Sequence, residues 1–85
     1  MEDLTAQDIK TMLAEGENVN VEFKECGRAL PKDFWPTYSS FANTHGGWII
    51  LGVKEHTDRK LPDKFEAVGV VDVEKTTDEL WTLLD

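Results

Sequence analysis

The sequence predicts a small α+β domain in which a mixed sheet of three or more strands is packed by helices, in the order αβαββα. Three patterns predict this class. Apolar residues alternate with polar ones in one segment and run without interruption in another, and three further segments carry helix start signals. Eighty-five residues correspond to one domain, residues 1–85. The single Cys26 excludes an internal disulfide, so a hydrophobic core must hold the chain together.

The first helix is predicted to begin after Thr5 and to end at Gly16. The Thr5 hydroxyl can cap the amide of Asp8, and the acidic Asp8 favours the positive end of the helix. Its apolar face consists of Ile9, Met12 and Leu13. Glycine commonly follows the last turn of a helix, because it tolerates left-handed backbone conformations.

A strand is predicted next, over residues 18–24. Its apolar side chains are those of Val19, Val21 and Phe23, and its polar ones are those of Asn20, Glu22 and Lys24. Because successive side chains of a strand point to opposite faces, this alternation predicts a strand with one buried face.

A second helix is predicted over roughly 34–44, after a loop that contains Gly27 and Pro31. Asp33 stands at the N-cap position, and Pro36 falls in the first turn, where its missing N–H costs little. Its apolar side chains near one face are Trp35, Tyr38, Phe41 and Ala42.

The second half of the chain predicts two more strands and a helix. Residues 48–53 form a continuous apolar run, which favours a strand buried on both faces in the middle of the sheet. Residues 54–64 are polar and predict a loop or hairpin tip, and a further strand is expected over 65–71. The last helix should begin near Asp72 or at a capping box starting at Thr76. It stops abruptly, so we expect the N-terminal fragment of a longer protein, truncated at the C-terminus.

The formal charge of −8 is concentrated at the two ends of the chain. Residues 1–18 and 72–85 each carry five acids and one base, whereas residues 19–71 carry seven of each. This excludes binding of nucleic acid through bulk positive charge, but leaves room for a local site in the neutral centre. No apolar run approaches the roughly 20 residues that span a bilayer, and the first residues lack a secretory signal. We therefore expect a cytoplasmic protein without membrane association.

Three short segments stand out, in the neutral centre or at its border. They are Glu17-x-x-x-x-Glu22-Phe23-Lys24, Phe41-Ala42-Asn43-Thr44-His45-Gly46-Gly47 and Ile50-Leu51-Gly52-Val53-Lys54-Glu55. The second is most simply explained as a sharp corner from helix to strand, because Gly46 and Gly47 supply backbone freedom and Asn43 can satisfy free carbonyls. With Thr44 and Gly52, these residues are the candidates for a structural motif.

Taken together, the three segments resemble the Schlafen AlbA-type domain, a DNA-binding module that is also named divergent AAA. The pattern is EFK, then FANT-x-GG, then a hydrophobic strand that ends in GV, and the likeness covers about residues 4–84. The resemblance implies a compact α+β fold with a role in nucleic-acid contact. It also implies a place at the N-terminus of longer bacterial transcriptional regulators.

Within the Schlafen branch, the resemblance implies an RNA-cleaving site of three acids, which here fall on Glu17, Glu22 and Glu55. Family members more often have Asp at the third position and an acidic pair after GV, whereas this chain has Lys54 before Glu55. Three carboxylates at adjacent strand ends could hold Mg²⁺ or Mn²⁺, which polarises a phosphate and activates water. Each glutamate can equally be a solvated surface side chain, or a cross-strand partner of a lysine.

The glycine pair does not form a nucleotide-binding P-loop. Gly46 and Gly47 lead from a helix into a strand, whereas a P-loop leads from a strand into a helix and ends in Lys-Ser or Lys-Thr. Nucleotide hydrolysis by this segment is therefore excluded.

Nucleic-acid binding would draw on basic residues of two segments. The candidates are Lys24, Arg28 and Lys32 after the first predicted strand and Arg59, Lys60 and Lys64 in the predicted loop. Neighbouring acids dilute both clusters, so binding by these 85 residues should be weak and sensitive to salt. Exposed aromatic side chains such as Tyr38 or Trp48 can stack on bases, although a core position is commoner for them.

Three function classes follow from these observations. The first is a nucleic-acid-binding module of a regulator, which needs no cofactor and is not an enzyme. The second is a ribonuclease that depends on Mg²⁺ or Mn²⁺ held by the three glutamates. The third is a protein-interaction or dimerisation module, including a homodimer, in which an exposed strand edge pairs with a partner.

Overall fold

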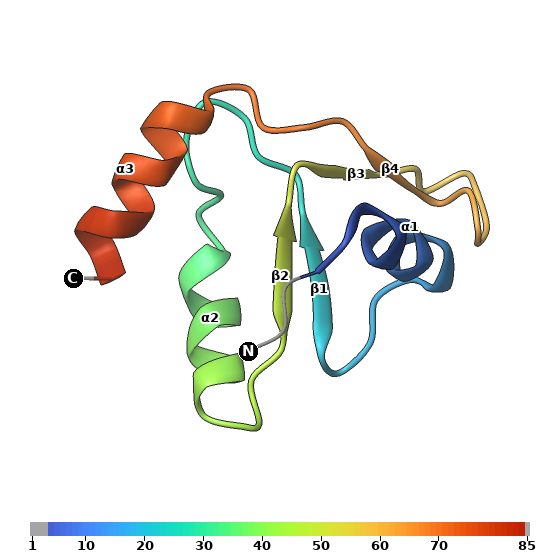
Figure 1. The fold of residues 1–85 in the computed structure, drawn as a ribbon, viewed down its shortest axis with the longest axis horizontal. Helices are drawn as coiled ribbons and strands as arrows, with labels where there is room; N and C mark the ends of the chain where they lie inside the picture. The colour runs from blue at the N-terminus through green and yellow to red at the C-terminus, as the bar shows by residue number, and fades with distance from the viewer. Residues whose placement is uncertain (1–3, 85) are drawn as a thin grey trace.

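The computed structural model describes residues 4–84, in which the chain forms three helices and four strands (Figure 1). In chain order they are α1 (Ala6–Glu15), β1 (Val21–Lys24), α2 (Phe34–Ala42), β2 (Trp48–Leu51), β3 (Val53–Glu55), β4 (Phe65–Ala67) and α3 (Val73–Leu84). This arrangement confirms the α+β class. Residues 1–3, which bear on the signal-sequence prediction, and Asp85, where a truncation is expected, lie outside the described residues.

The strands form two small sheets. β1 and β2 pair in parallel, from Val21 opposite Trp48 to Lys24 opposite Leu51. Parallel neighbours need a long crossover connection, and the segment that contains α2 supplies it. β3 and β4 pair antiparallel as a hairpin. Of the two alternatives predicted for residues 54–64, a loop or a hairpin tip, the hairpin is correct, but Lys54 and Glu55 belong to β3.

Gly52 joins the two sheets at a sharp corner. Its N–H donates to the Lys24 carbonyl at 2.8 Å, and its own carbonyl accepts the N–H groups of Val68 and Gly69, both at 2.9 Å. Its φ is +85°, and a Cβ placed on it would lie 2.7 Å from the Gly69 carbonyl carbon. Only glycine meets both conditions, because a side chain would strain the left-handed backbone and collide with the facing chain. The glycine of the GV pair therefore divides the predicted strand into β2 and β3.

The prediction of one central strand over 48–53, buried on both faces, is wrong. β2 ends at Leu51, pairs with β1 alone among the described residues, and leaves its four side chains half-buried. A continuous apolar run shows that the segment has no charged side chains. It does not show how many strands and helices will pack against that segment. The extra corner raises the strand count by one relative to the order αβαββα.

Several element boundaries also differ from their predictions. Val19 is 86% exposed in a turn, because Asn18 and Val21 exchange backbone hydrogen bonds and the strand begins only at Val21. β4 ends at Ala67 and not at residue 71. Of the two predicted starts for the last helix, Asp72 is correct, since its carboxylate accepts the Lys75 N–H at 3.0 Å.

Of the first two helices, α1 follows its prediction closely and α2 does not. The Thr5 side chain accepts the Asp8 N–H, the Asp8 carboxylate accepts the Thr5 N–H, and Gly16 ends the helix. α2 is shorter than predicted, and Asp33 stands at its N-cap position without a side-chain capping bond. None of the described helices combines the length and apolar character that a membrane crossing requires.

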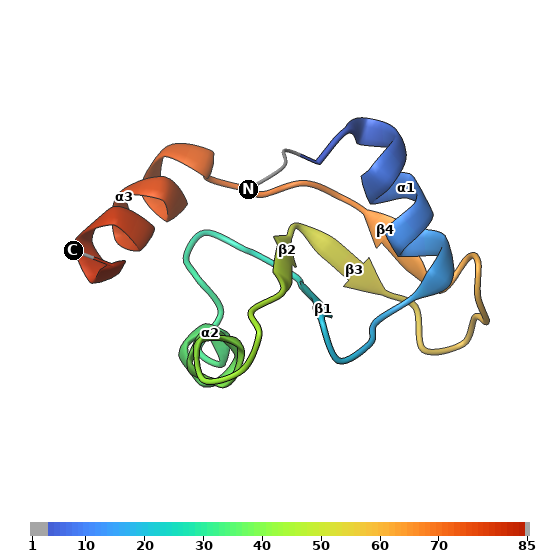
Figure 2. The same cartoon turned by 60° about the horizontal axis from the view of Figure 1, so that its bottom comes forward.

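The core lies between α1 and the strands β1, β3 and β4. Leu13, Val21, Phe23 and Val53 form a buried cluster, and the Phe65 ring meets the Phe23 ring edge-on at 4.8 Å between centroids. Figure 2 shows α1 beside the β3–β4 hairpin, with α2 and α3 on the opposite side of the β1–β2 pair. The largest buried cluster therefore lies in one half of the molecule, although Phe34 of α2 and Thr76 of α3 are also buried.

Candidate functional site

The three glutamates singled out in the sequence line one cleft of about 450 Å³. Four parts of the chain contribute its charged lining: the turn before β1, strand β1 with the residue after it, the start of α2, and β3. The charged residues are Glu17, Glu22, Lys24, Glu25, Asp33 and Glu55. Five carboxylates thus face one ammonium group, which makes the cleft acidic.

Glu17 closes the cleft on the side of β1 that does not face β2. Its Oε2 accepts the backbone N–H of Phe23 at 2.9 Å, so the carboxylate satisfies an N–H on the open edge of β1. Burial raises the pKa of Glu17, the bond from Phe23 opposes this shift, and the nearby Glu22 and Glu55 carboxylates raise the pKa further. Glu17 therefore keeps its proton to a higher pH than an ordinary glutamate does.

Lys24 provides the ammonium group in the cleft. The residue is only 8% exposed, and its Nζ lies 2.6 Å from Asp33 Oδ2 and 3.5 Å from Glu22 Oε1. Burial works against the charged form, but the hydrogen bond and charge of Asp33, aided by Glu22, raise the pKa of Lys24 above its usual value. The same bond lowers the pKa of Asp33. Lys24 therefore stays charged, and its charge is already neutralised within the protein.

A second lysine pairs with the third glutamate. Lys64 Nζ lies 3.1 Å from Glu55 Oε2 and 5.6 Å above the centre of the Phe65 ring. Both groups of this pair are partly exposed, so the attraction between them is modest and screened by salt. The pair borders the cleft beside β3 and β4.

The carboxylates, as they are placed, do not fit a divalent metal ion. A metal site needs several oxygen ligands that converge on one point. Among the described residues, no group of three or more His, Cys, Asp or Glu side chains could hold a metal ion. Glu22 and Glu55 instead pair with lysines, and Glu17 accepts a backbone N–H. The metal role of the three glutamates stays a prediction from the sequence.

The other predicted basic residues lie in the two loops that border the cleft. Arg28 and Lys32 belong to the loop that contributes Asp33, and Arg59 and Lys60 follow Thr57 in the β3–β4 loop. All four side chains are exposed, and none takes part in an ion pair within residues 4–82. These cations are accessible to an outside ligand, unlike Lys24.

The glycine-rich motif forms a corner at the other end of the sheet. The Gly46 N–H and the Thr44 hydroxyl both donate to the Phe41 carbonyl at 3.1 Å, and the Asn43 N–H donates to Ser39. A Cβ on Gly47 would lie 2.6 Å from the Asn20 carbonyl oxygen, where β1 and β2 meet. These residues shape the turn from α2 into β2, and none of them lines the acidic cleft.

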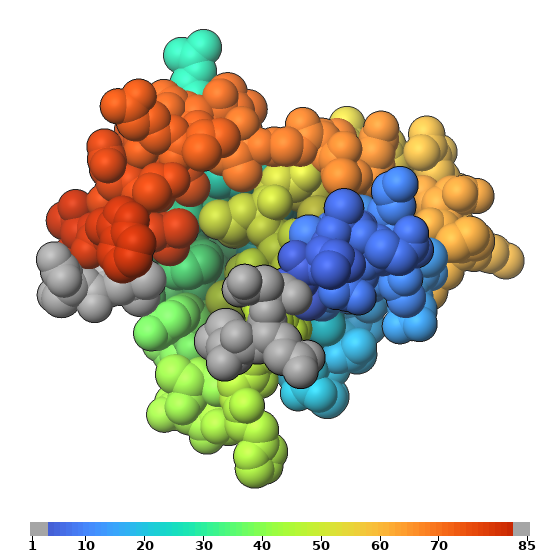
Figure 3. All heavy atoms as spheres, in the orientation of Figure 1, coloured from blue at the N-terminus to red at the C-terminus, as the bar shows by residue number. Residues whose placement is uncertain are grey.

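An apolar groove of about 390 Å³ adjoins this corner. It runs between α2, β2 and α3, and its lining includes Phe34, Tyr38, Phe41, Leu51 and Leu80. In the space-filling view, the yellow-green atoms around β2 remain visible between α3 and α1 (Figure 3). The groove exists because α2 and α3 do not cover β2 completely, so that the side chains of β2 stay half-buried.

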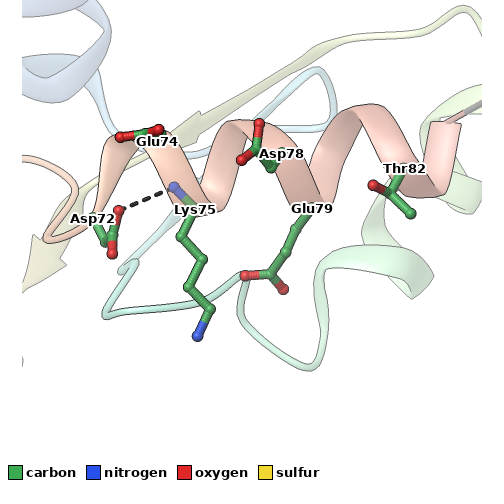
Figure 4. Close-up of a pocket in the computed structure, with 6 residues that line it drawn as sticks. All are labelled: Asp72, Glu74, Lys75, Asp78, Glu79 and Thr82. Carbon is green, nitrogen blue, oxygen red and sulfur yellow. Dashed lines mark hydrogen bonds between the residues drawn. The ribbon is translucent and has the colours of Figure 1, made fainter.

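A third hollow, of about 540 Å³, follows α3 and carries four carboxylates and one lysine (Figure 4). Its lining consists of Asp72, Glu74, Lys75, Asp78, Glu79 and Thr82, and none of these residues belongs to the three sequence motifs. The larger size of this hollow therefore does not make it the better candidate. The acidic cleft brings motif residues from distant parts of the chain together, whereas this hollow lies along a single helix.

Sequence reasoning missed two neighbours of the motifs. Asp33 was assigned only to the start of a helix, although it holds Lys24. His56 falls in the polar segment that predicts a loop or hairpin tip, whereas it is half-buried and lies 2.7 Å from Glu66 across the hairpin. The bond to His56 lowers the pKa of Glu66. A hairpin register would have suggested the second pair, but no local pattern points to the first.

Comparisons with known proteins give a family for the chain. The family model described as Schlafen, AlbA_2 matches residues 17–84, a stretch that starts at Glu17 and includes Glu22 and Glu55. No curated protein matched the chain, and no solved structure matched it. The family model covers well over half of the sequence and agrees with the motifs and with the α+β fold. The chain therefore belongs to the Schlafen AlbA_2 family, which is associated with nucleic acids.

Proposed function

We propose that this domain binds nucleic acid across the acidic cleft, with phosphates held by the two bordering loops. The observation that carries the proposal is the placement of exposed, unpaired cations on both loops: Arg28 and Lys32 on one, Arg59 and Lys60 on the other. Phosphate contacts supply most of the affinity of nucleic-acid-binding proteins. Membership of the Schlafen AlbA_2 family supports the same conclusion.

The charge pattern also sets the orientation of a bound strand. Phosphates are repelled by the carboxylates at the centre of the cleft and attracted by the cations at its borders. Carboxylates accept hydrogen bonds from amino groups of bases and from ribose hydroxyls. A strand that crosses the cleft therefore places its phosphates at the loops and its sugar or base edges toward Glu17, Glu22 and Glu55.

A fluorescence titration with labelled single-stranded and duplex oligonucleotides, across a salt series, tests this function. Micromolar or weaker binding is expected, of the order of 10⁻⁴–10⁻⁶ M, with strong salt dependence. Arg59→Ala and Lys32→Ala should each weaken binding and reduce the salt slope by about 1. Lys10→Ala, at an exposed lysine on α1 outside both loops, is the matched control and should change neither. The proposal fails if no oligonucleotide binds at low salt.

A second candidate function is cleavage of RNA in the same cleft. It is favoured by one observation: Glu17, Glu22 and Glu55 line the same cleft, and the charges of the other two help to raise the pKa of Glu17. A raised pKa makes the protonated form of a carboxyl group more available, and a general acid needs that form. Incubation of labelled RNA with and without Mg²⁺ or Mn²⁺ tests this candidate. Activity that Glu22→Ala abolishes would establish it, and activity equal to background with every ion would dismiss it.

The wider biological role is proposed on the same basis. We propose a cytoplasmic location and a part in transcriptional regulation in a bacterial cell, because bacterial members of the resembled family occur in such regulators. Dimerisation through a strand edge is the competing role, since β2 pairs with β1 alone among the described residues. Sedimentation at several protein concentrations separates the two: a concentration-dependent dimer supports the second.

A further inference from the structure

The buried ammonium group of Lys24 is not placed as an ordinary phosphate contact. Its side chain is 9% exposed, and carboxylate oxygens of Asp33 and Glu22 already lie within 2.6 and 3.5 Å of it. A phosphate could reach Lys24 only by displacing one of these carboxylates. Lys24 therefore differs from the exposed cations of the two loops, although the sequence groups them together.

The bond to Asp33 replaces an interaction that is common at this position. An aspartate at the N-cap of a helix normally accepts a backbone N–H of the first turn. Asp33 makes no such bond, and its carboxylate binds Lys24 instead. A buried lysine is costly unless it is paired and hydrogen-bonded, so this use of Asp33 keeps Lys24 in place. The bond also ties the start of α2 to β1.

Glu22 is the group on which this anchored charge acts. The Glu22 side chain is 35% exposed and lies among the other carboxylates of the cleft, so repulsion and hydration both favour its rotation into water. Lys24, two residues along the same strand and on the same face, attracts it from the opposite direction. The position of Glu22 in the cleft therefore depends on an attraction that balances these two effects.

We infer that Lys24 is a positioning residue of the cleft: its ammonium group, anchored by Asp33, holds the Glu22 carboxylate beside Glu17. This inference rests on the proposed function, because the place of Glu22 matters to a strand that crosses the cleft. The lysine of the EFK motif then positions a carboxylate of the cleft, and the cations of the two loops contact the phosphates.

The Glu17 carboxyl group reports on the position of Glu22, and NMR titration of the whole chain follows it. Glu22→Gln should lower the pKa of Glu17, because it removes a nearby like charge. Lys24→Met should lower the pKa of Glu17 to the same value, since the released Glu22 rotates away. Lys24→Arg should restore the wild-type value. In the Glu22→Gln background, Lys24→Met should cause no further shift.

Two results of this titration overturn the inference. One is a folded Lys24→Met variant in which the pKa of Glu17 stays at the wild-type value. The other is an equal shift with and without Glu22→Gln, which would mean that Lys24 acts on the fold and not through Glu22. If Lys24→Met loses the dispersed NMR spectrum of a folded domain, Lys24→Gln replaces it. The glutamine amide can still donate a hydrogen bond to Asp33. The same two results then decide.

A salt series with an oligonucleotide separates this inference from the proposed function. Lys24→Met should leave the slope of affinity against salt unchanged, whereas a fall of about 1 would identify Lys24 as a phosphate contact and overturn the inference. An absence of binding by the wild-type chain would contradict the proposed function. The carboxyl titration needs no nucleic acid, so it still decides the role of Lys24.

Discussion

The two halves of the molecule are built from similar amounts of apolar sequence but pack to different degrees. In the packed half, α1 and the strands β1, β3 and β4 enclose the buried cluster around Phe23. In the open half, α2 and α3 make few contacts with other elements, β2 stays half-buried, and Trp81 is 68% exposed. Figures 1 and 2 show α1 and the β3–β4 hairpin on one side of the β1–β2 pair and α2 and α3 on the other.

This difference bears on the function, because the acidic cleft belongs to the packed half. Phe23, Val53 and Phe65 belong to the core cluster or pack against it and also line the cleft, so the core holds the strands that carry Glu22 and Glu55. A binding site holds its side chains in place more precisely when they project from rigid helices or strands. The open half contributes only Asp33, at the start of α2, to the charged lining of the cleft.

Truncation of Phe23 is expected to have the largest effect on the free energy of unfolding. A small effect would contradict the difference in packing between the two halves. Phe23→Ala removes a ring from the core and should cost about 3–5 kcal/mol of unfolding free energy. Tyr38→Ala, in the aromatic group of α2, should cost only about 1 kcal/mol. Urea unfolding followed by circular dichroism measures both. Equal costs would mean that the two halves are packed alike.

Substitution of Gly52 tests the corner that connects the halves. Gly52→Ala should cost about 2–3 kcal/mol, because the residue has a φ of +85° and a Cβ would collide with the Gly69 backbone. Gly27→Ala is the matched control, since a Cβ there meets nothing within 4 Å, and it should change stability by less than about 0.5 kcal/mol. Thermal or urea unfolding compares them. A tolerated Gly52→Ala would show that the corner can relax.

Removal of the α1 cap measures how strongly this helix supports the packed half. Thr5→Ala deletes the hydroxyl that accepts the Asp8 N–H and should cost about 1 kcal/mol. Thr11→Ala, in the middle of the same helix, should be neutral or slightly stabilising, because alanine has the higher helix propensity. If Thr5→Ala leaves the urea midpoint unchanged, α1 is not part of the cooperative unit.

The smallest expected effect is the pH dependence that Glu17 contributes. Its pKa in the folded chain lies above the ordinary glutamate value of 4.5, so its contribution to stability is complete below that value and is lost as pH rises through the folded pKa. Glu17→Gln should therefore raise the free energy of unfolding by about 0.3 kcal/mol at neutral pH, a small value because solvent screens the charges. In acid the substitution should change it less.

Urea midpoints at about pH 4 and about pH 7 check this prediction, with Glu15→Gln as the control at an exposed glutamate nearby. The amide oxygen that Glu17→Gln introduces can still accept the Phe23 N–H, so the edge of β1 stays satisfied. A loss of stability at neutral pH would show that the negative charge of Glu17 supports the fold, in contrast to the like-charge repulsion described here.

The sequence predicts local structure well where a local cause acts. The Thr5 cap on the Asp8 amide, the end of α1 at Gly16 and the corner at Gly46 and Gly47 were all predicted, because each depends on residues within a few positions. The extent of β1 and the burial of β2 were predicted wrongly. Both depend on which segments come to lie beside the strand, and hydrophobic periodicity does not encode that.

For the candidate site, the sequence pointed to Glu17, Glu22 and Glu55 through a family resemblance, and the structure brings them into one cleft. It did not reveal that Glu22 and Glu55 pair with lysines, or that Glu17 bonds an edge N–H. The six basic candidates looked equivalent in the sequence. Burial separates Lys24 from the exposed cations of the loops, and burial is a property of the folded chain alone.

The sequence by itself determined the types of element, the glycine corners and the family, because these follow from patterns over short stretches of chain. Only the tertiary structure decided which charges meet. Lys24 and Asp33 are nine residues apart and Glu17 and Glu55 thirty-eight, so their contacts arise when the strands and α2 pack around one cleft. Electrostatic interactions depend on distance and on exclusion of water, and neither exists until the chain has folded.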